Sequence, residues 1–387
     1  MTQEPKFSTD RFVLKLGLFY AAYFLYGGVQ LPFFPLWLES RGLDASAIGV
    51  VIAVPMVVRI IFTPIIGHQV DRRSALKATL VIVSAAACVG TVVVGLAQSF
   101  WSIFVAVTLA SIAYAPLPSL SDAYALNGLR VRGKAYGPVR LWGSVSFIVA
   151  NVGAGFLLGY IAPSQLIWLV ASAFFLTFLA ALALAPLEPH APRPEGASPS
   201  PRSLWSNRPF VLVIAAAGLT QASHAFYYGF STLEWRGVGL SGTLIGVLWG
   251  VGVVAEVILF AVSGRLPRAI APTLMIAVGA GGAVIRWVAM AFEPSIAVLL
   301  PLQILHAGSF AATHIGAMAF LSRAVPRELA ATAQGTLATV TGLLTASATG
   351  LSGLIYAASG SRTYLVMAAM ASVGVICALA ANRLRND

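Results

Sequence analysis

Residues 42 to 67 read GLDASAIGVVIAVPMVVRIIFTPIIG, and residues 239 to 264 read GLSGTLIGVLWGVGVVAEVILFAVSG. Both stretches begin with Gly-Leu, carry Ile-Gly-Val at the same place and end with Gly, so the second repeats the first 197 positions later. Each is an apolar run of membrane length with one ion near its middle, and the ion changes sign from Arg59 to Glu256. Two copies of one membrane unit, each with a costly charge at the matching place, are typical of a transporter.

The composition also indicates a membrane protein. Of the 387 residues, 58% are hydrophobic and 10% are charged, and the mean hydropathy is +0.86. A helix needs roughly 20 apolar residues to cross a bilayer. Twelve such runs lie near 12–38, 46–67, 78–98, 100–126, 138–161, 164–186, 210–235, 243–264, 272–292, 295–322, 329–357 and 361–382. We therefore predict an all-α membrane protein with twelve transmembrane helices.

Basic residues indicate the orientation of the chain. Short cytoplasmic loops keep Lys and Arg, and 18 of the 24 basic residues lie on the side of the two termini, against only Arg41, Arg236 and Arg362 on the other side. We expect both termini to be cytoplasmic. The net charge of +11 then reflects loops beside an anionic leaflet and implies no nucleic-acid partner.

One polar stretch divides the chain. Residues 188–209, EPHAPRPEGASPSPRSLWSNRP, are rich in Pro, Ser and Arg, which is typical of a linker. It separates a predicted six-helix half at 1–187 from a second at 210–387. Both halves start and end on one side, so the repeat is parallel, as in the two halves of major facilitator proteins. The two cysteines, Cys88 and Cys377, have no paired spacing, so neither a disulfide nor a metal site is predicted.

Polar stripes at helical spacing suggest a cavity wall or hydrogen bonds between helices. In the seventh predicted span the stripe is Gln221, His224, Tyr228, Ser231 and Trp235, and in the first it is Tyr20, Tyr23, Gly27, Gln30 and Phe34. The tenth span carries Gln303, His306, Phe310, Thr313 and His314. The two histidines could bind substrate, relay protons or pair with a neighbouring helix.

Charges in the spans form a second group of candidates. An ion at the centre of a membrane helix costs roughly 3 kcal/mol on insertion scales, and Arg59 and Glu256 both lie about fourteen residues into their spans. Asp122 and Arg140 lie near span ends, where an ordinary interfacial pair is the alternative to a functional role. Glu256 is the best candidate for proton coupling, because a carboxyl group in apolar surroundings changes its protonation with its neighbours. The candidates for the substrate and proton pathway are Arg59, Asp122, Arg140, Gln221, His224, Tyr228, Glu256, Arg286, His306 and His314.

Several motifs resemble a known family. Gly67 followed by Asp71-Arg72 resembles the loop signature of the major facilitator superfamily, and we take Gly67, Asp71 and Arg72 as a candidate gating loop. The segments LPFF at 31–34, RLWGS at 140–144, YYGFS at 227–231, and Ala255-Glu256 are similar to the phenylpropionic acid permease branch of that superfamily. The resemblance covers essentially the whole chain. It implies proton-coupled uptake of a small organic solute through the bacterial inner membrane.

A more distant resemblance is to lactose/proton symporters. Those carry an acid on helix four, Arg on five, an acid on eight, Arg on nine and His on ten. Asp122, Arg140, Glu256, Arg286 and His306 occupy these helices here in that order. The resemblance implies substrate contacts for the first two residues and coupling roles for the last three. The Glu that such symporters carry one turn after the His is Ser309 in this chain, so one carboxylate of their proton path is missing.

We therefore predict a symporter without a cofactor, driven by the proton gradient. Its expected partners are a small-molecule substrate, protons and lipid, and it is expected to be a monomer. One surplus positive charge in the spans and many aromatic residues favour an aromatic carboxylate, although a sugar or nucleoside fits almost as well. A drug/proton antiporter of the same fold is a further alternative. An enzyme or receptor would need a nucleophile with its base, a metal cluster or a soluble domain, and the sequence contains none.

Overall fold

A computed structural model describes residues 11–73, 75–187, 202–265, 267 and 270–386, and every element within them is helical. The α-helices are α1 (Arg11–Ser40), α2 (Ala45–Arg73), α3 (Leu76–Leu96), α4 (Phe100–Tyr114), α5 (Leu117–Val131), α6 (Tyr136–Leu157), α7 (Leu166–Ala183), α8 (Arg202–Ser206), α9 (Arg208–Ala222), α10 (Ala225–Gly237), α11 (Gly242–Val262), α12 (Pro272–Met290), α13 (Ile296–His306), α14 (Thr313–Ala324), α15 (Ala330–Ser359) and α16 (Thr363–Asn386). Short 3₁₀ segments lie at Pro163–Gln165, Ser263–Arg265, Arg327–Leu329 and Gly360–Arg362, and a π-helix, η3, spans Ala307–Ala312.

Within the described residues, eleven stretches are long and apolar enough to cross a membrane. They agree closely with the predicted spans, except that the last two predicted spans fall in one stretch of 55 residues, Ala330–Leu384. That stretch contains α15 and α16, which are separated at Gly360–Arg362. Of the predicted linker, residues 188–201 lie outside the described part, and α8 and the start of α9 occupy its end.

Three predicted spans are not continuous helices. The fourth divides into α4 and α5 at Ala115 and Pro116, where the proline lacks an N–H to continue the helix. The seventh divides into α9 and α10 at Ser223 and His224, and the tenth contains η3 directly after His306. Sequence periodicity predicts one continuous polar face through the seventh and tenth spans, and it does not predict these breaks.

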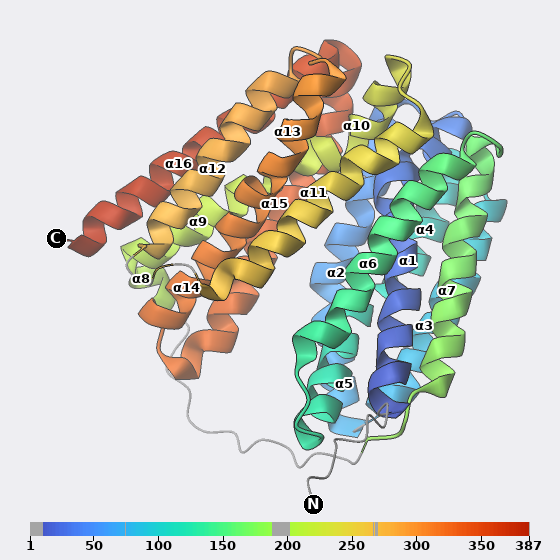
Figure 1. The fold of residues 1–387 in the computed structure, drawn as a ribbon, viewed down its shortest axis with the longest axis horizontal. Helices are drawn as coiled ribbons and strands as arrows, with labels where there is room; N and C mark the ends of the chain where they lie inside the picture. Colours follow the sequence, from blue (N-terminus) through green and yellow to red (C-terminus); the bar gives the residue numbers. More distant parts are fainter. Residues whose placement is uncertain (1–10, 74, 188–201, 266, 268–269, 387) are drawn as a thin grey trace, which may run out of the picture.

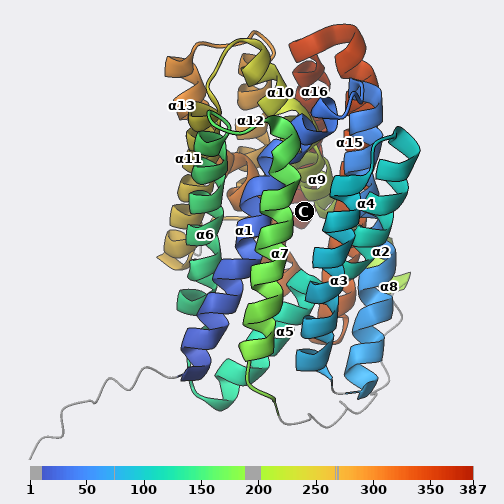
Figure 2. The same ribbon diagram turned by 90° about the vertical axis from the view of Figure 1, so that its right-hand side faces the viewer.

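The helices form two groups (Figure 1). Helices α1 to α7 make up one group and α9 to α16 the other, and the two groups are tilted relative to one another in Figure 1 and overlap with similar direction in Figure 2. The outside of both groups carries large exposed apolar side chains, among them Trp101, Leu109, Val278 and Ile376. Such a surface matches lipid and not water. The chain is thus a multi-pass membrane protein by its surface as well as by its helix lengths.

The sequence repeat reappears as a repeated local structure. Gly42 and Gly239 both adopt the left-handed conformation, with φ of 81° and 87°. Two residues later a side-chain oxygen accepts a backbone N–H and caps the next helix: Asp44 caps α2, and Ser241 caps α11. A residue with a Cβ is strained at such a φ, which explains why both copies begin with glycine.

Glycines also allow the two groups of helices to touch. The start of α2 packs against the end of α15, and the start of α11 packs against the end of α6. A methyl group on Gly353 would overlap the Ala45 carbonyl oxygen, and one on Gly155 would overlap that of Gly242. These close contacts lie near the α1–α2 and α10–α11 connections. Figure 1 shows the groups close together near α10 and further apart near α5 and α14.

Candidate functional site

A chain of polar contacts links three helices of the C-terminal group. Arg286 on α12 is fully buried, and its guanidinium lies 2.9 Å from His306 Nδ1 on α13. On the other side of that imidazole, Nε2 lies 3.5 Å from a carboxylate oxygen of Glu256 on α11. Arg286, Glu256 and His306 were predicted from different spans, and the structure brings all three together. Glu256 is the most accessible of them, with 22% of its side chain exposed.

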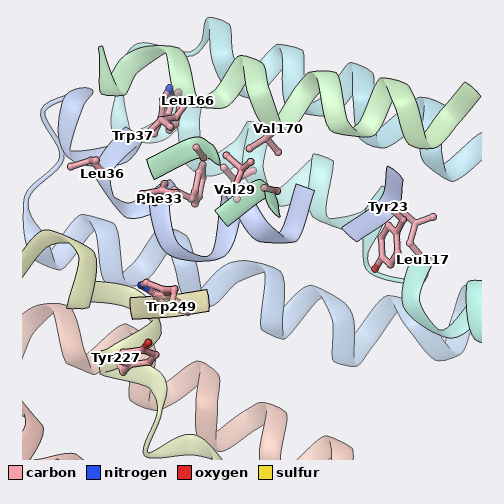
Figure 3. Packing of buried hydrophobic residues seen from close by; sticks show 14 of the residues in the cluster. Tyr23, Val29, Phe33, Leu36, Trp37, Leu117, Leu166, Val170, Tyr227 and Trp249 are labelled. Atoms are coloured by element: carbon pink, nitrogen blue, oxygen red, sulfur yellow. The ribbon is translucent and has the colours of Figure 1, made fainter. Parts of the chain in front are cut away.

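Gln303 completes the surroundings of Arg286. Its side-chain oxygen accepts one hydrogen bond from the guanidinium at 2.8 Å and another from the Tyr227 hydroxyl at 2.9 Å. The guanidinium also lies over the rings of Tyr227, at 4.4 Å, and Trp287, at 4.7 Å. Trp249 stacks on Tyr227 with ring centroids 4.6 Å apart (Figure 3). Hydrogen bonds and rings together hold this arginine in one position.

His224 belongs to the same cluster through η3. Its Nδ1 faces the Thr220 carbonyl oxygen one turn earlier, at 3.1 Å, and its Nε2 lies 3.0 Å from the Ser309 hydroxyl. A neutral imidazole donates from one nitrogen only, so the carbonyl contact assigns the proton to Nδ1 and leaves Nε2 to accept from Ser309. Ser309 therefore has a local partner here, at the position where lactose/proton symporters carry a carboxylate.

The charges of the N-terminal group are arranged differently. Asp122 on α5 accepts hydrogen bonds from the hydroxyls of Tyr20 and Tyr136, both at 2.7 Å. Arg140 on α6 lies over the ring of Phe24 at 3.9 Å. No ion pair joins Asp122 to Arg140 in the described part of the chain. The interfacial pair considered from the sequence is therefore not formed, because tyrosine hydroxyls and an aromatic ring satisfy the two charges separately.

The remaining candidates lie around these groups. Gln221 donates to the Phe310 carbonyl oxygen at 3.3 Å, and Tyr228 stacks on His224 at 5.7 Å. His314 is exposed, with its ring 6.1 Å from that of Phe260, and it is within electrostatic range of Glu256. His314 thus lies at the surface, eight residues after the buried His306, which is about 12 Å along a helix.

Two predictions need correction or fall outside the structure. Arg59 was expected to be a buried charge like Glu256, but its side chain is exposed, and its electrostatic neighbours are Tyr26 and Tyr114. In the candidate gating loop, a methyl group placed on Gly67 would meet no atom within 4 Å. The side chains of Asp71 and Arg72 lie outside the described part.

Sequence reasoning missed part of the cluster. Gln303 was recognised only as one of several polar residues on its span, and Tyr227, Trp287 and Ser223 were not singled out as site residues. Trp287 donates to the Ser223 hydroxyl at 2.9 Å. The spacing contained one usable signal, since Gln303 precedes His306 by three residues and so lies on the same helix face. Nothing in the sequence indicates that Tyr227 reaches another helix.

Comparison with known proteins identifies the family. The model of the MFS_1 like family matches residues 13–366. A probable 3-phenylpropionic acid transporter of Escherichia coli (strain K12) is 30% identical over 371 residues, which cover 92% of this chain and 94% of that protein. Maltose permease of Geobacillus stearothermophilus is 26% identical over 323 residues, covering 82% of this chain and 80% of that protein.

Solved structures share the fold. The nucleoside transporter NupG has a TM-score of 0.80 at 17% identity, covering 97% of this chain and 99% of that one. A bacterial homolog of the human lysosomal transporter Spinster, in an inward-facing and unoccupied conformation, has a TM-score of 0.73 at 14% identity, covering 97% and 98%. The predicted resemblance to the phenylpropionic acid permease branch is confirmed. Proteins of this family are transporters and not enzymes, and they generally need no cofactor. The chain belongs to the MFS_1 like family of major facilitator transporters.

Proposed function

We propose that this protein is a proton-coupled symporter that takes up a small organic acid, with an aromatic carboxylate favoured. It would act by alternating access between two six-helix halves, as a monomer in a bacterial inner membrane with both termini cytoplasmic. The observation that carries the proposal is the chain of contacts from Arg286 through His306 to Glu256. It joins a fixed positive charge to a partly exposed carboxylate inside membrane-spanning helices.

The contacts around His306 favour Glu256 as the group that takes the proton. Arginine stays charged in proteins, so its N–H groups can only donate. His306 Nδ1 must therefore accept from Arg286, and in the neutral ring Nε2 carries the hydrogen and points it at Glu256. A second proton on His306 would break its contact with Arg286. The carboxylate of Glu256 has no such constraint.

The substitution at Ser309 supports the same assignment. Lactose/proton symporters are expected to hold a carboxylate at this position, and here the hydroxyl is engaged by His224. Because this site offers no second acid, we assign proton coupling to Glu256 alone. Arg140 lies on α6, which packs against α11 from the other group of helices, so movement between the groups would change the positive charge near Glu256.

Helix lengths support twelve crossings. A continuous helix of 55 residues would be about 80 Å long, far more than the roughly 30 Å of a bilayer core. The break at Gly360, where φ is 55°, divides Ala330–Leu384 into two helices that each fit one crossing. An even number of crossings agrees with the concentration of basic residues on the side of the termini. In that orientation the close glycine contacts lie at the ends of the helices away from the cytoplasm. The two groups of helices then separate toward the cytoplasm, which is the inward-facing conformation.

The substrate class is supported by the relatives and by the side chains in the spans. The E. coli relative is named for 3-phenylpropionic acid, and this chain carries Arg59, Arg140 and Arg286 with several aromatic rings close to them. Positive charges and rings are suited to an acid with an aromatic group. Maltose permease supports a second candidate, a proton-coupled sugar symporter. A sugar would need neutral hydrogen-bonding groups more than a surplus positive charge.

Reconstituted protein tests the proposal directly. Liposomes loaded with a pH-sensitive dye should acidify inside when 3-phenylpropionate is added outside at equal pH, and should not respond to maltose. An acidification with maltose alone would favour the sugar symporter. Substrate uptake with no proton movement would contradict proton coupling. Empty liposomes measure the passive entry of the acid and must be subtracted.

A further inference from the structure

We propose that Arg59 binds the carboxylate of the transported acid and that Tyr26 and Tyr114 form the surface against which its ring lies. This assignment rests on the proposed function, since it assumes that the substrate is an acid. It goes beyond that function by naming the residues that recognise the acid. It also places them on α1, α2 and α4, away from the cluster around Glu256.

The three arginines within the spans differ in what already satisfies them. Arg286 is bound by a histidine and a glutamine and lies over two rings. Arg140 lies over Phe24 and Tyr20. Among the residues that the structure describes, Arg59 has no hydrogen bond, no ion pair and no ring beneath its guanidinium. An exposed charge within a span that has no hydrogen-bonding partner among the described residues is available to a partner that comes from outside.

Arg59 does not point toward lipid. Val57, Ile61 and Ile65 recur every four residues on α2 and are exposed by 41%, 50% and 51%, so they mark its lipid-facing side. Arg59 is two residues from both Val57 and Ile61, which is about 200° around a helix. Its exposed side chain therefore lies on the opposite side of α2, toward the interior.

Hydrogen bonds of α2 agree with this direction. Thr63 follows Arg59 by four residues and so lies on the same face. Its hydroxyl donates to the Ala115 carbonyl oxygen at 3.3 Å, at the junction of α4 and α5. The face of α2 that carries Met56 packs against α15, where the Thr349 hydroxyl lies 3.8 Å from the Met56 sulfur. Arg59 is thus directed toward α4, where Tyr114 lies.

The two tyrosines form a rigid aromatic wall. Tyr26 stacks on Phe174 with centroids 4.5 Å apart and planes at 27°, and Tyr114 stacks on the same ring at 5.8 Å and 24°. The Tyr114 hydroxyl is fixed by Ser111 at 2.9 Å. The two tyrosine rings lie 6.1 Å apart with their planes tilted by 45°, so a further ring could contact one by its face and the other by its edge, and Arg59 supplies the positive charge beside it.

A cavity behind this wall is not the substrate site. It is lined by Gln30, Phe34, Thr91 and Tyr114 among others, and its volume is about 20 Å³. That is room for about one water molecule, and an aromatic acid is many times larger. We therefore place the substrate ring on the side of the tyrosines that faces Arg59.

The test compares an acid with its neutral analogue. Binding of 3-phenylpropionate and of 3-phenylpropionamide to purified protein would be measured by calorimetry for the wild type, Arg59→Gln and Arg59→Lys. We expect the wild type to prefer the acid by about 10- to 100-fold, the range for a charge-assisted hydrogen bond. Arg59→Gln should lose this preference and still bind the amide, which also shows that the variant is folded. Arg59→Lys should keep part of it. The matched control is Arg362→Gln, which removes an exposed charge at the α15–α16 connection and should leave the preference unchanged.

The outcomes separate the two proposals. If the wild type binds the acid and Arg59→Gln prefers it equally, the assignment of Arg59 is wrong and the acid transporter stands. If the wild type binds neither compound but binds maltose, the proposed function is wrong and the assignment falls with it. Loss of both acid and amide binding in a folded Arg59→Gln protein would also contradict the assignment, because it would show a role beyond the carboxylate.

Discussion

The two groups of helices treat their charges in opposite ways. In the C-terminal group Arg286, His306 and Glu256 are connected to one another, so each charge or dipole has a protein partner. In the N-terminal group Asp122 is held by two phenols and Arg59 has no hydrogen-bonding partner within the described residues. A set of connected partners that includes a carboxylate can take up and release a proton. An open charge can take a ligand. The difference suggests that coupling and recognition lie on different sides of the molecule.

We expect the largest effect from Glu256→Gln, which tests whether proton coupling depends on the C-terminal group alone. Glu256→Gln keeps the shape of the side chain and removes its ability to exchange a proton, so uptake against a gradient should be abolished while substrate exchange continues. Proteoliposomes with and without an imposed pH gradient measure both activities. Glu328→Gln, an exposed residue before α15, is the matched control. Full accumulation by Glu256→Gln would show that coupling does not depend on this group.

Replacing Arg286 or Arg59 by Gln should affect stability differently. Arg286→Gln leaves His306 and Gln303 without their donor, and we expect a loss of about 2 to 5 kcal/mol. Arg59→Gln removes a charge that has no such partner, and we expect the apparent melting temperature in detergent to stay unchanged or rise. Thermal unfolding of both variants without substrate measures the difference. Equal destabilisation by the two substitutions would mean that Arg59 has a structural partner and that the two groups of helices do not differ in this way.

Asp122 tests the N-terminal arrangement. Asp122→Ala removes the acceptor shared by Tyr20 and Tyr136, which should cost about 2 to 4 kcal/mol. Asn keeps an oxygen in the same place and should recover at least half of that loss, because it can still accept both phenol hydrogens. Melting temperatures of the two variants decide this. If Asn is as harmful as Ala, Asp122 acts through its charge and resembles the C-terminal carboxylate.

Ser309→Ala should have the smallest effect. It removes the hydroxyl that donates to His224 and should lower stability by about 1 kcal/mol, with accumulation of substrate retained. The measurement combines thermal unfolding with the uptake assay used for Glu256. Loss of accumulation in this variant would show that Ser309 takes part in the proton path despite lacking an acid.

Much of the fold and part of the site could be predicted from the sequence. Apolar runs longer than twenty residues locate spans because lipid leaves few alternatives, and the repeat correctly paired the turns at Gly42 and Gly239. Glu256, Arg286 and His306 could be named because ions and imidazoles are rare within spans. The exposure of Arg59 and the separation of Asp122 from Arg140 could not be predicted. They depend on which rings from other helices lie beside each charge, and hydrophobic periodicity does not contain that information.

The π-helix at Ala307–Ala312 has hydrogen bonds between residues five apart, one residue more than in the α-helices on either side. If this segment returned to α geometry, everything beyond it would turn by roughly 100° relative to His306. The bond from the Thr313 hydroxyl to the Ser309 carbonyl oxygen, at 2.9 Å, is of the i to i−4 kind that α geometry also allows, so it does not oppose this change. His314, at present exposed, would swing to another side of the helix. The π-helical segment therefore sets the relative direction of the two imidazoles of this span, His306 at the buried cluster and His314 at the surface.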